Sequence, residues 1–234
     1  MDSDLSRKRL VFSCAFGTKF GGFYPAIPGF DGVLFSNNRS LEKLVEERGW
    51  KFRLVRKHKL SDDFRISSIQ SKYIKFLQFF DEFPEFLNYE EYLYFDHKFE
   101  VKKEHINFID SSIQDETSIF IRNTPRLKLS IEDEIQDAMG QERYVITMPQ
   151  TIEWINTIVS ERNLSKKNRI MNTGLMYYKN LQMIMPLLDE VYETVWRLAQ
   201  PECQIIWALL SQEYDHLIQR AEWSELNPFW MAPD

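Results

Sequence analysis

The sequence predicts an α/β protein in which helices flank a central sheet. Short apolar runs alternate along the chain with longer segments whose apolar positions recur at helical spacing. The chain also opens in the order strand, loop, strand, helix, strand, which is typical of layered α/β domains. The first strands of such a domain end along one rim of the sheet, so we expect ligand contacts at that rim.

The first two strands are the clearest elements in the N-terminal part. Residues 10–16 (LVFSCAF) read as a buried strand, and a glycine-rich, aromatic loop follows at 17–23. A second strand at 33–36 ends in Asn37 and Asn38. Both strands therefore end in polar or flexible residues at the expected ligand rim.

The next segments predict a short helix, a third strand and a longer helix. Ser40 is expected to cap a helix that Gly49 closes, and 50–55 alternates as a strand. The longer helix covers 66–80 and packs on the sheet through Ile66, Ile69, Tyr73, Phe76 and Phe80. Its neighbouring flank carries Arg65, Ser68, Lys72 and Lys75.

A further apolar run at 92–95 ends abruptly in Asp96. A carboxylate at the carboxyl end of a buried strand lies where open α/β sheets bind ligands. The alternative is an aspartate that only caps a turn. Asp96 is therefore the leading candidate for a functional residue.

The second half of the chain predicts two more strands and several helices. The strands are expected at 118–123 and 170–178, and Ser130 begins a helix that stops near Gly140. The C-terminal third should be mostly helical, with a second helix beginning near Cys203 after an apolar stripe. That stripe consists of Ile184, Leu187, Leu188, Val191, Val195 and Leu198.

Bulk composition narrows the class of protein. No apolar run approaches the roughly 20 residues needed to cross a bilayer, and residues 1–10 are polar rather than signal-like. Cys14 and Cys203 stand far apart without a second ligand pair, so neither a disulfide framework nor a zinc site is indicated. The net charge of -6 argues against a general nucleic-acid binder. These features favour a cytoplasmic protein.

Taken in order, residues 9–219 resemble the GT-A type of glycosyltransferase. The helix pattern Ser71-Lys-Tyr-Ile-Lys75 is similar to the Ser-Arg-x-x-Lys pattern of little-characterised transferase-like families, with Lys72 in place of arginine. The chain also resembles the GT-A domains that large algal viruses encode for building capsid glycans. The resemblance implies a single GT-A, Rossmann-like domain over 1–234, alone or within a longer protein, with a mixed central sheet and a helical C-terminal third.

In this family a strand-ending Asp-x-Asp motif holds Mn²⁺ or Mg²⁺, which bridges the donor phosphates. Hard oxygen ligands suit such ions. The motif here is Asp96-His97-Lys98, so the second carboxylate is missing and a positive charge takes its place. In order of preference, Asp96 holds the metal with another group, Lys98 partly replaces the cation, or transfer activity has been lost.

The resemblance also assigns the donor diphosphate to basic residues. Arg65, Lys72 and Lys75 are expected to neutralise it together with Lys98. A solvated helix face is the alternative for any one of these lysines.

Further residues are implied for the base and the sugar of the donor. The nucleobase and ribose would meet the strand-end residues Phe16, Gly17, Asn37 and Asn38. These glycine and asparagine residues are equally typical of turns. A later strand with an Asn-x-Gly pattern lines the sugar pocket of the family, and here it reads Asn172-Thr173-Gly174, although a glycine in a strand also marks bulges.

Carboxylates for catalysis are less clear. The family often begins a later helix with Asp-Gln, where this chain has Cys203-Gln204. Glu134, which follows Arg126 in an Arg-then-acid pattern, is the candidate catalytic residue beside Asp96. The alternative is that Glu134 only complements the dipole at a helix N-terminus.

The implied activity is metal-assisted transfer of a hexosyl or deoxyhexosyl group from a UDP- or GDP-linked donor to a glycan or glycoprotein. No nucleic-acid partner and no membrane span are expected, and the location would be the cytoplasm, that of the host if the protein is viral. One alternative is a non-catalytic nucleotide-sugar-binding scaffold. Another is a sugar nucleotidyltransferase that uses the glycine-rich loop at 17–23 for phosphate.

Overall fold

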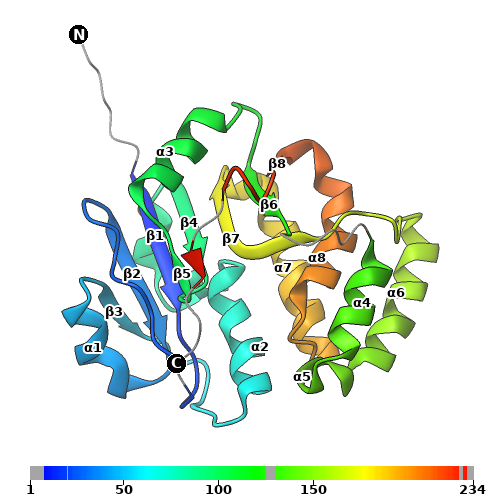
Figure 1. The fold of residues 1–234 in the computed structure, drawn as a ribbon, viewed down its shortest axis with the longest axis horizontal. Helices are drawn as coiled ribbons and strands as arrows, with labels where there is room; N and C mark the ends of the chain where they lie inside the picture. The colour runs from blue at the N-terminus through cyan, green and yellow to red at the C-terminus, as the bar shows by residue number, and fades with distance from the viewer. Residues whose placement is uncertain (1–7, 20, 125–129, 227–228, 231–234) are drawn as a thin grey trace.

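A computed structural model describes residues 8–19, 21–124, 130–226 and 229–230. Its centre is a seven-stranded mixed sheet with the strand order β3-β2-β1-β4-β7-β6-β8 (Figure 1). The strands are β1 (Arg9–Cys14), β2 (Asp31–Ser36), β3 (Lys51–Leu54), β4 (Glu91–Phe95), β6 (Ile119–Asn123), β7 (Met171–Lys179) and β8 (Ile218–Ala221). The predicted α/β class with a mixed central sheet is confirmed. A separate antiparallel pair joins β5 (Phe99–Glu100) to β9 (Phe229–Trp230).

Eight α-helices surround the sheet in the described part of the chain. They are α1 (Glu42–Glu47), α2 (Phe64–Lys75), α3 (Lys103–Ser112), α4 (Ile131–Met139), α5 (Glu142–Val145), α6 (Met148–Arg162), α7 (Leu181–Leu198) and α8 (Cys203–Leu210). Short 3₁₀ helices cover Arg39–Leu41, Gln78–Asp81, Pro84–Asn88 and Ser211–Leu217. The C-terminal third is mostly helical, as predicted.

Strand direction determines which segments meet at the functional rim. β1 pairs in parallel with β2 and β4, whereas β7 runs antiparallel to β4, with Leu175 opposite Phe95. The carboxyl ends of β1 and β4 therefore lie beside the amino end of β7. A backbone hydrogen bond joins these ends directly: the Asp96 amide donates to the Gly174 carbonyl at 2.8 Å.

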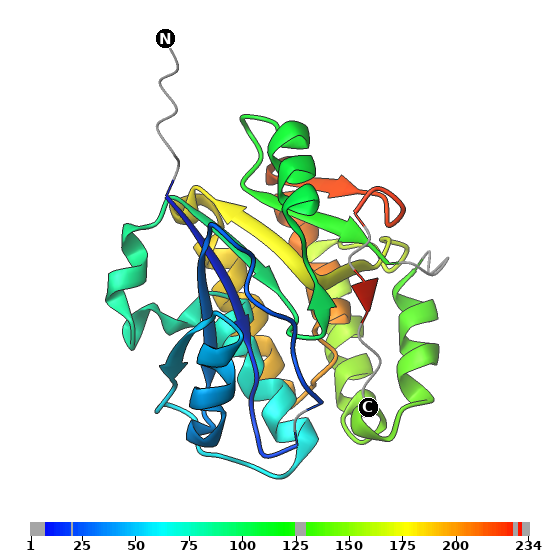
Figure 2. The same ribbon diagram turned by 60° about the vertical axis from the view of Figure 1, so that its left-hand side comes forward.

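Alternating side chains of the strands build an apolar core on each face of the sheet. On one face Phe12 of β1 and Tyr94 of β4 join a core that includes residues of α2, α7 and α8. On the other face Val11 and Leu93 join a smaller core with residues of α1 and α3. Figure 2 shows helices in front of and behind the sheet. Asp96, two residues beyond Tyr94, continues toward the α2 face.

The helix predicted over 66–80 is shorter than expected and begins earlier. Asp63 caps it by accepting hydrogen bonds from the Arg65 and Ile66 amides, and α2 ends at Lys75. Leu77 then adopts a left-handed conformation with φ of 58°, which reverses the chain. Phe76 stays buried just beyond the helix, but Ile66 is 41% exposed and faces away from the core.

Other predicted boundaries differ at their caps. Asn38, rather than Ser40, is the capping residue, because its side chain accepts from the Ser40 amide at the start of the 3₁₀ turn before α1. Ser130 does cap α4 by accepting from the Asp133 amide, as predicted. The sequence reading missed α6, whose buried positions Met148, Thr151, Ile155 and Ile158 have helical spacing. None of the helices in the described residues combines the length and apolar character that a membrane crossing requires.

Candidate functional site

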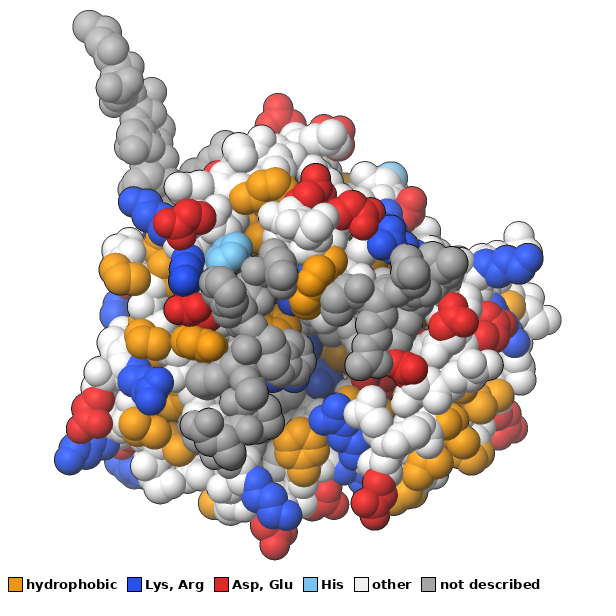
Figure 3. Space-filling view, viewed as in Figure 1, with side chains coloured by type: hydrophobic (Ala, Val, Ile, Leu, Met, Phe, Trp, Pro, Cys, Tyr) orange, Lys and Arg blue, Asp and Glu red, His pale blue; other side chains and the backbone are white. Residues whose placement is uncertain are grey.

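A cavity of about 780 Å³ lies at the rim where β1 and β4 end and β7 begins. α2 forms one wall, and residues of α4, α5 and the start of α8 form the opposite wall. Lysine and arginine side chains gather in and beside the hollow at the middle of the face drawn in Figure 3. The cavity therefore occupies the position at which the sequence predicted ligand chemistry.

The α2 wall presents two nearly buried lysines. Lys72 and Lys75 are 7% and 4% exposed, and both line the cavity from the last turn of the helix. Their spacing places them on one flank of α2, where the helix dipole favours cations. Lys72 Nζ lies 3.5 Å from Ser68 Oγ and forms no ion pair with any described residue. A buried ammonium with only a hydroxyl partner is costly, so this wall favours an anionic ligand.

Asp96 faces the same space and pairs with the second lysine. Its Oδ1 lies 3.3 Å from Lys75 Nζ and accepts a hydrogen bond of 2.7 Å from the Tyr94 hydroxyl. Burial alone would raise the pKa of Asp96, but the charges of Lys75 and Lys98 and the Tyr94 hydrogen bond outweigh it. The pKa of Asp96 is therefore well below its usual range, and the carboxylate is ionised.

The groups around this ion pair have equally clear charge states. Burial lowers the pKa of Lys75, but the charge and hydrogen bond of Asp96 together with the effects of Cys203 and Cys14 outweigh it and leave the pKa raised. Burial raises the pKa of the Cys14 thiol to about 12, and that of Tyr94 is also well above its ordinary value. At neutral pH the carboxylate thus stands between a charged lysine and neutral hydroxyl and thiol groups.

The start of β7 closes the floor of the cavity. Thr173 Oγ1 lies 3.5 Å from Lys75 Nζ and 3.3 Å from Cys203 Sγ. A Cβ atom on Gly174 would come within 2.9 Å of Asp96 Oδ2 and 2.7 Å of Phe99. Only glycine fits here without displacing the carboxylate, so Gly174 shapes the site through its missing side chain. Asn172 also lines the cavity, and its Oδ1 accepts from the Gly174 amide.

Two further cations lie near the Asp96 carboxylate. Lys98 lines the cavity, and burial lowers its pKa although the charge of Asp96 acts in the opposite direction. Arg122 is fully buried between the Trp223 ring, 3.8 Å from its guanidinium carbon, and the Phe99 ring at 4.9 Å. Burial lowers the pKa of Arg122 to about 9, against a smaller effect of Asp96.

The guanidinium of Arg122 is held by neutral groups. It donates to the Leu226 carbonyl at 2.8 Å and to Asn172 Oδ1 at 3.4 Å. Among the described residues it has no carboxylate within ion-pair distance. Arg122 was not singled out from the sequence, because nothing in a strand-end arginine indicates that it will be enclosed by aromatic rings.

The opposite wall is mainly acidic, although Arg143 of α5 also lines it. Glu134 and Asp137 of α4 and Glu202 before α8 all line the cavity, and Glu134 is only 4% exposed. Glu202 caps α8 by accepting from the Gln204 amide at 3.0 Å. Burial, followed by the nearby Glu202 charge, raises the pKa of Tyr144 well above its ordinary value. A basic wall and a mainly acidic wall therefore line the same cavity.

Several predicted contacts do not reach the cavity. Asn37 accepts from the Gly17 amide and donates to the Lys59 carbonyl and to Gln70. Asn38 donates to the Gly17 carbonyl and caps the following turn. Both side-chain amides therefore hold the loop after β1 through the backbone of Gly17. Gly17 has a left-handed backbone with φ of 86° and lies close to Ser67.

Of the other residues predicted to bind the donor, some line the cavity and others do not. Phe16 lines the cavity, whereas Gly17, Asn37, Asn38 and Arg65 are not among the lining residues. Arg65 is adjacent to Phe64, and it is Phe64, Ser67, Ser68 and Ser71 that extend the cavity face of α2 toward its N-terminus. Ser68 and Ser71 were named on this helix from the sequence, whereas Ser67 was not singled out. Arg126 lies outside the described residues.

The residues around Asp96 do not fit a Mn²⁺ or Mg²⁺ site. No group of three His, Cys, Asp or Glu side chains among the described residues is placed to share a metal ion. The Asp96 carboxylate is already paired with Lys75, and Lys98 stands where a second carboxylate would be needed. Like charges a few ångströms apart repel by about 4 kcal/mol per unit pair at an effective dielectric constant of 20. The metal ligand role predicted for Asp96 thus lacks partner ligands.

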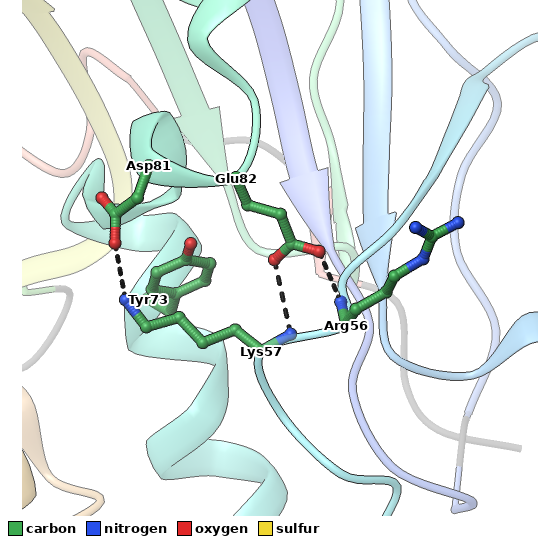
Figure 4. A pocket seen from close by; sticks show the side chains of 5 residues that line it. All are labelled: Arg56, Lys57, Tyr73, Asp81 and Glu82. Carbon is green, nitrogen blue, oxygen red and sulfur yellow. Dashed lines mark hydrogen bonds and ion pairs between the residues drawn. The ribbon is translucent and has the colours of Figure 1, made fainter.

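A second, shallower recess lies on the outer surface. It has a volume of about 520 Å³ and is lined by Arg56, Lys57, Tyr73, Asp81 and Glu82 (Figure 4). Lys57 Nζ pairs with Asp81 at 2.6 Å, and the Glu82 carboxylate accepts from the Arg56 amide at 2.6 Å. Lys57, Asp81 and Glu82 are therefore engaged within the recess, whereas the Arg56 guanidinium has no ion-pair partner among the described residues.

Comparisons with known proteins found several solved structures with a similar arrangement of the chain. No protein-family model matches the chain, and no curated protein matches it in sequence. A glycosyltransferase involved in glycosylation of the major capsid of PBCV-1 is similar over 94% of this chain and 84% of its own, with 14% identity and a TM-score of 0.42. Mouse xyloside xylosyltransferase 1 is similar over 93% of this chain and 86% of its own, with 8% identity and a TM-score of 0.42.

Nucleotide-activating enzymes are similar to the same degree. A CMP-2-keto-3-deoxy-manno-octonic acid synthetase in complex with CTP matches 92% of this chain and 89% of its own, with 13% identity and a TM-score of 0.42. The residues of the cavity itself are therefore the basis for any inference about function.

Proposed function

We propose that the chain is a glycosyltransferase that moves a sugar from a nucleoside-diphosphate donor to a hydroxyl acceptor. One observation carries the proposal: Lys72 and Lys75, both less than one-tenth exposed, face a cavity at the carboxyl ends of parallel strands. Buried ammonium groups in a cavity favour a multiply charged anion such as a diphosphate. A volume of about 780 Å³ is within the range of small-molecule sites.

The walls of the cavity suggest how the donor lies. The diphosphate would face the basic wall of Lys72, Lys75 and Lys98. The nucleoside would lie toward Phe16 and the loop that follows β1. The sugar would then reach the start of β7, with Asn172 and Thr173, and the acidic wall beyond it. This assignment keeps Phe16, Lys72, Lys75, Lys98 and the 172–174 segment as binding residues, and it sets Gly17, Asn37, Asn38 and Arg65 aside as supporting structure.

The chemistry is a displacement at the anomeric carbon. The acceptor oxygen forms a bond to that carbon, the bond to the diphosphate oxygen breaks, and the electron pair leaves with the diphosphate. The fixed ammonium groups stabilise the charge that grows on the leaving group. The acceptor proton needs a carboxylate, and Glu134 is the proposed base because it is buried in the wall opposite the lysines.

The finer features of the prediction belong to the same proposal. They are a UDP- or GDP-linked hexosyl or deoxyhexosyl donor, a glycan or glycoprotein acceptor, one domain over residues 1–234 and a cytoplasmic location. Metal assistance by Mn²⁺ or Mg²⁺, expected from the resemblance, is not supported by the ligand set around Asp96.

A donor-turnover assay tests the proposal. The full chain is incubated with a panel of UDP- and GDP-sugars, and release of the nucleoside diphosphate is measured. We expect turnover with at least one donor, a loss of about 100-fold or more in Glu134→Gln with donor binding retained, and loss of donor binding in Lys72→Met. Lys57→Met in the outer recess is the matched control and should behave as the unmodified chain. Binding without turnover of any donor would instead favour the non-catalytic scaffold.

A nucleotidyltransferase is the second candidate, and one observation favours it. Lys19, Gly21 and Gly22 of the glycine-rich loop also line the cavity, where backbone amides can cradle phosphate groups. Incubation with sugar phosphates and nucleoside triphosphates separates the two reactions. Release of inorganic pyrophosphate, in the absence of donor turnover, would assign the chain to nucleotide activation.

A further inference from the structure

The cationic groups next to Asp96 come from separate parts of the fold. Lys72 and Lys75 belong to the last turn of α2, and Lys98 follows β4 in the position where the Asp-x-Asp pattern has its second carboxylate. Each of these charges acts on Asp96 and lowers its pKa. The charge of Asp96 in turn acts to raise the pKa of Arg122 on β6, although burial lowers it more. Several fixed cations are therefore built around a single ionised carboxylate.

The fold keeps these cations charged and in place. Lys75 Nζ lies 3.3 Å from Asp96 Oδ1, which favours its charged form, and it lies over the Tyr94 ring, 5.2 Å from the ring centroid. Asp96 itself is held by the Tyr94 hydroxyl and by its own amide, which donates to Gly174. Neither Tyr94 nor Cys14 adds negative charge at neutral pH, since the pKa of each is raised by burial.

A diphosphate placed in this cavity needs its charge neutralised, which a bridging divalent ion does in a metal-dependent enzyme. Here the Asp96 carboxylate is engaged by Lys75, and the residue two positions on is a lysine. The site thus offers ammonium groups at the place where a metal ligand set would be required. An ammonium group supplies the positive charge directly and carries three hydrogen-bond donors.

We propose that this chain binds the donor diphosphate without a divalent metal ion, through the ammonium groups of Lys72, Lys75 and Lys98, with Asp96 as a positioning residue for Lys75. This inference rests on the proposed function, since it assumes a diphosphate in the cavity. Asp96 holds Lys75 toward the ligand and contributes no metal bond. The loss of the second carboxylate at residue 98 is then a change of mechanism and not a loss of function.

Calorimetry on the full chain tests the inference with inorganic pyrophosphate, UDP and GDP as probes. In EDTA we expect at least one probe to bind, and its affinity should change by less than about threefold when MnCl₂ replaces the chelator. Binding that appears only with Mn²⁺ would overturn this inference and leave the proposed function intact. Failure of every probe in both conditions would overturn the proposed function and the inference together.

Variants at residue 98 sharpen the test. Lys98→Ala should weaken the probe by about tenfold in EDTA and gain nothing from Mn²⁺. Lys98→Asp rebuilds the carboxylate pair, and this variant should bind MnCl₂ alone and require it for UDP or GDP. Circular dichroism checks that both variants fold. A Lys98→Asp chain that remains indifferent to Mn²⁺, or an unmodified chain that binds MnCl₂ alone tightly, would contradict the replacement of the metal by Lys98.

Discussion

The α2 helix contributes to two hollows that use charge in opposite ways. Lys72 and Lys75 line the central cavity at 7% and 4% exposure, with Asp96 as the carboxylate that pairs with Lys75. Tyr73, between them in sequence, lines the outer recess, where Lys57 pairs with Asp81. The side chains of that outer pair are 45% and 66% exposed, so water screens them.

The two hollows differ in the partners and the burial of their lysines. In the recess, carboxylates accept from Lys57 Nζ and from the backbone amides of residues 56 and 57, whereas the Arg56 guanidinium forms no ion pair with the described residues (Figure 4). In the central cavity Lys72 and Lys75 are buried, and among the described residues Lys72 has only the Ser68 hydroxyl within hydrogen-bond distance. Volume alone would not distinguish the two hollows, but the state of their charges does.

Breaking the Lys75–Asp96 pair should have the largest effect. Lys75→Met leaves an ionised Asp96 without its partner, and we expect the free energy of unfolding to fall by about 3–5 kcal/mol. Urea unfolding measures this loss, and calorimetry with pyrophosphate should show that binding is lost as well. Lys57→Met, the corresponding change in the recess, should cost less than about 1 kcal/mol.

A double variant distinguishes a lost ion pair from poor packing. Asp96→Asn combined with Lys75→Met removes both charges, and it should recover much of the stability without restoring pyrophosphate binding. If the double variant is as unstable as Lys75→Met alone, the unpaired carboxylate is not the cause.

The second effect concerns His58, which packs between the two regions. Its ring stacks on Trp196 at 5.2 Å and meets the edges of Phe16 and Tyr73. Burial first, and then the charge of Lys57, lowers its pKa from 6.5 to about 4. The unfolded chain therefore binds a proton that the folded chain does not over that interval, and stability should fall by about 2–3 kcal/mol as the pH drops through it.

Urea unfolding at a series of pH values measures this slope. His58→Gln should flatten it, and the residual slope should reflect His97, whose pKa is also lowered, by burial in the first place. An unchanged slope in His58→Gln would show that this ring is not the titrating group.

The third effect tests the close approach of β7 to Asp96. Gly174→Ala places a methyl group within 2.9 Å of the Asp96 carboxylate, and we expect a loss of about 1–3 kcal/mol from overpacking. Gly140→Ala, at the exposed end of α4, is the matched control and should change stability by less than about 1 kcal/mol. Equal effects of the two substitutions would argue against a tight floor in the central cavity.

The smallest effect is expected in the recess. Asp81→Asn removes the ion pair with Lys57, and its cost should be less than about 1 kcal/mol and shrink further at high salt. Urea unfolding at two salt concentrations provides the measurement. A change of more than about threefold in UDP or GDP affinity would show that the two regions are coupled.

Much of the basic wall could be predicted from local sequence. An apolar run that ends in Asp96, and two lysines three residues apart on an amphipathic helix, are patterns that depend only on strand and helix geometry. The acidic wall and Arg122 depend on contacts between distant segments. The asparagines after β2, predicted to contact the donor base, hydrogen-bond to Gly17 in the structure, because an amide group can pair with a buried backbone as well as with a nucleobase.

The sequence by itself determined the α/β class, the strand that delivers Asp96 and the flank of α2 that carries the lysines, because hydrophobic periodicity and chain breaks are local properties. Only the tertiary structure decided that Lys75 pairs with Asp96, that Gly174 leaves room for the carboxylate and that Glu134 lines the same cavity as the lysines. These are relations between segments far apart in the chain. Charge states and metal fit follow from such distances, since both depend on which groups lie within a few ångströms of each other.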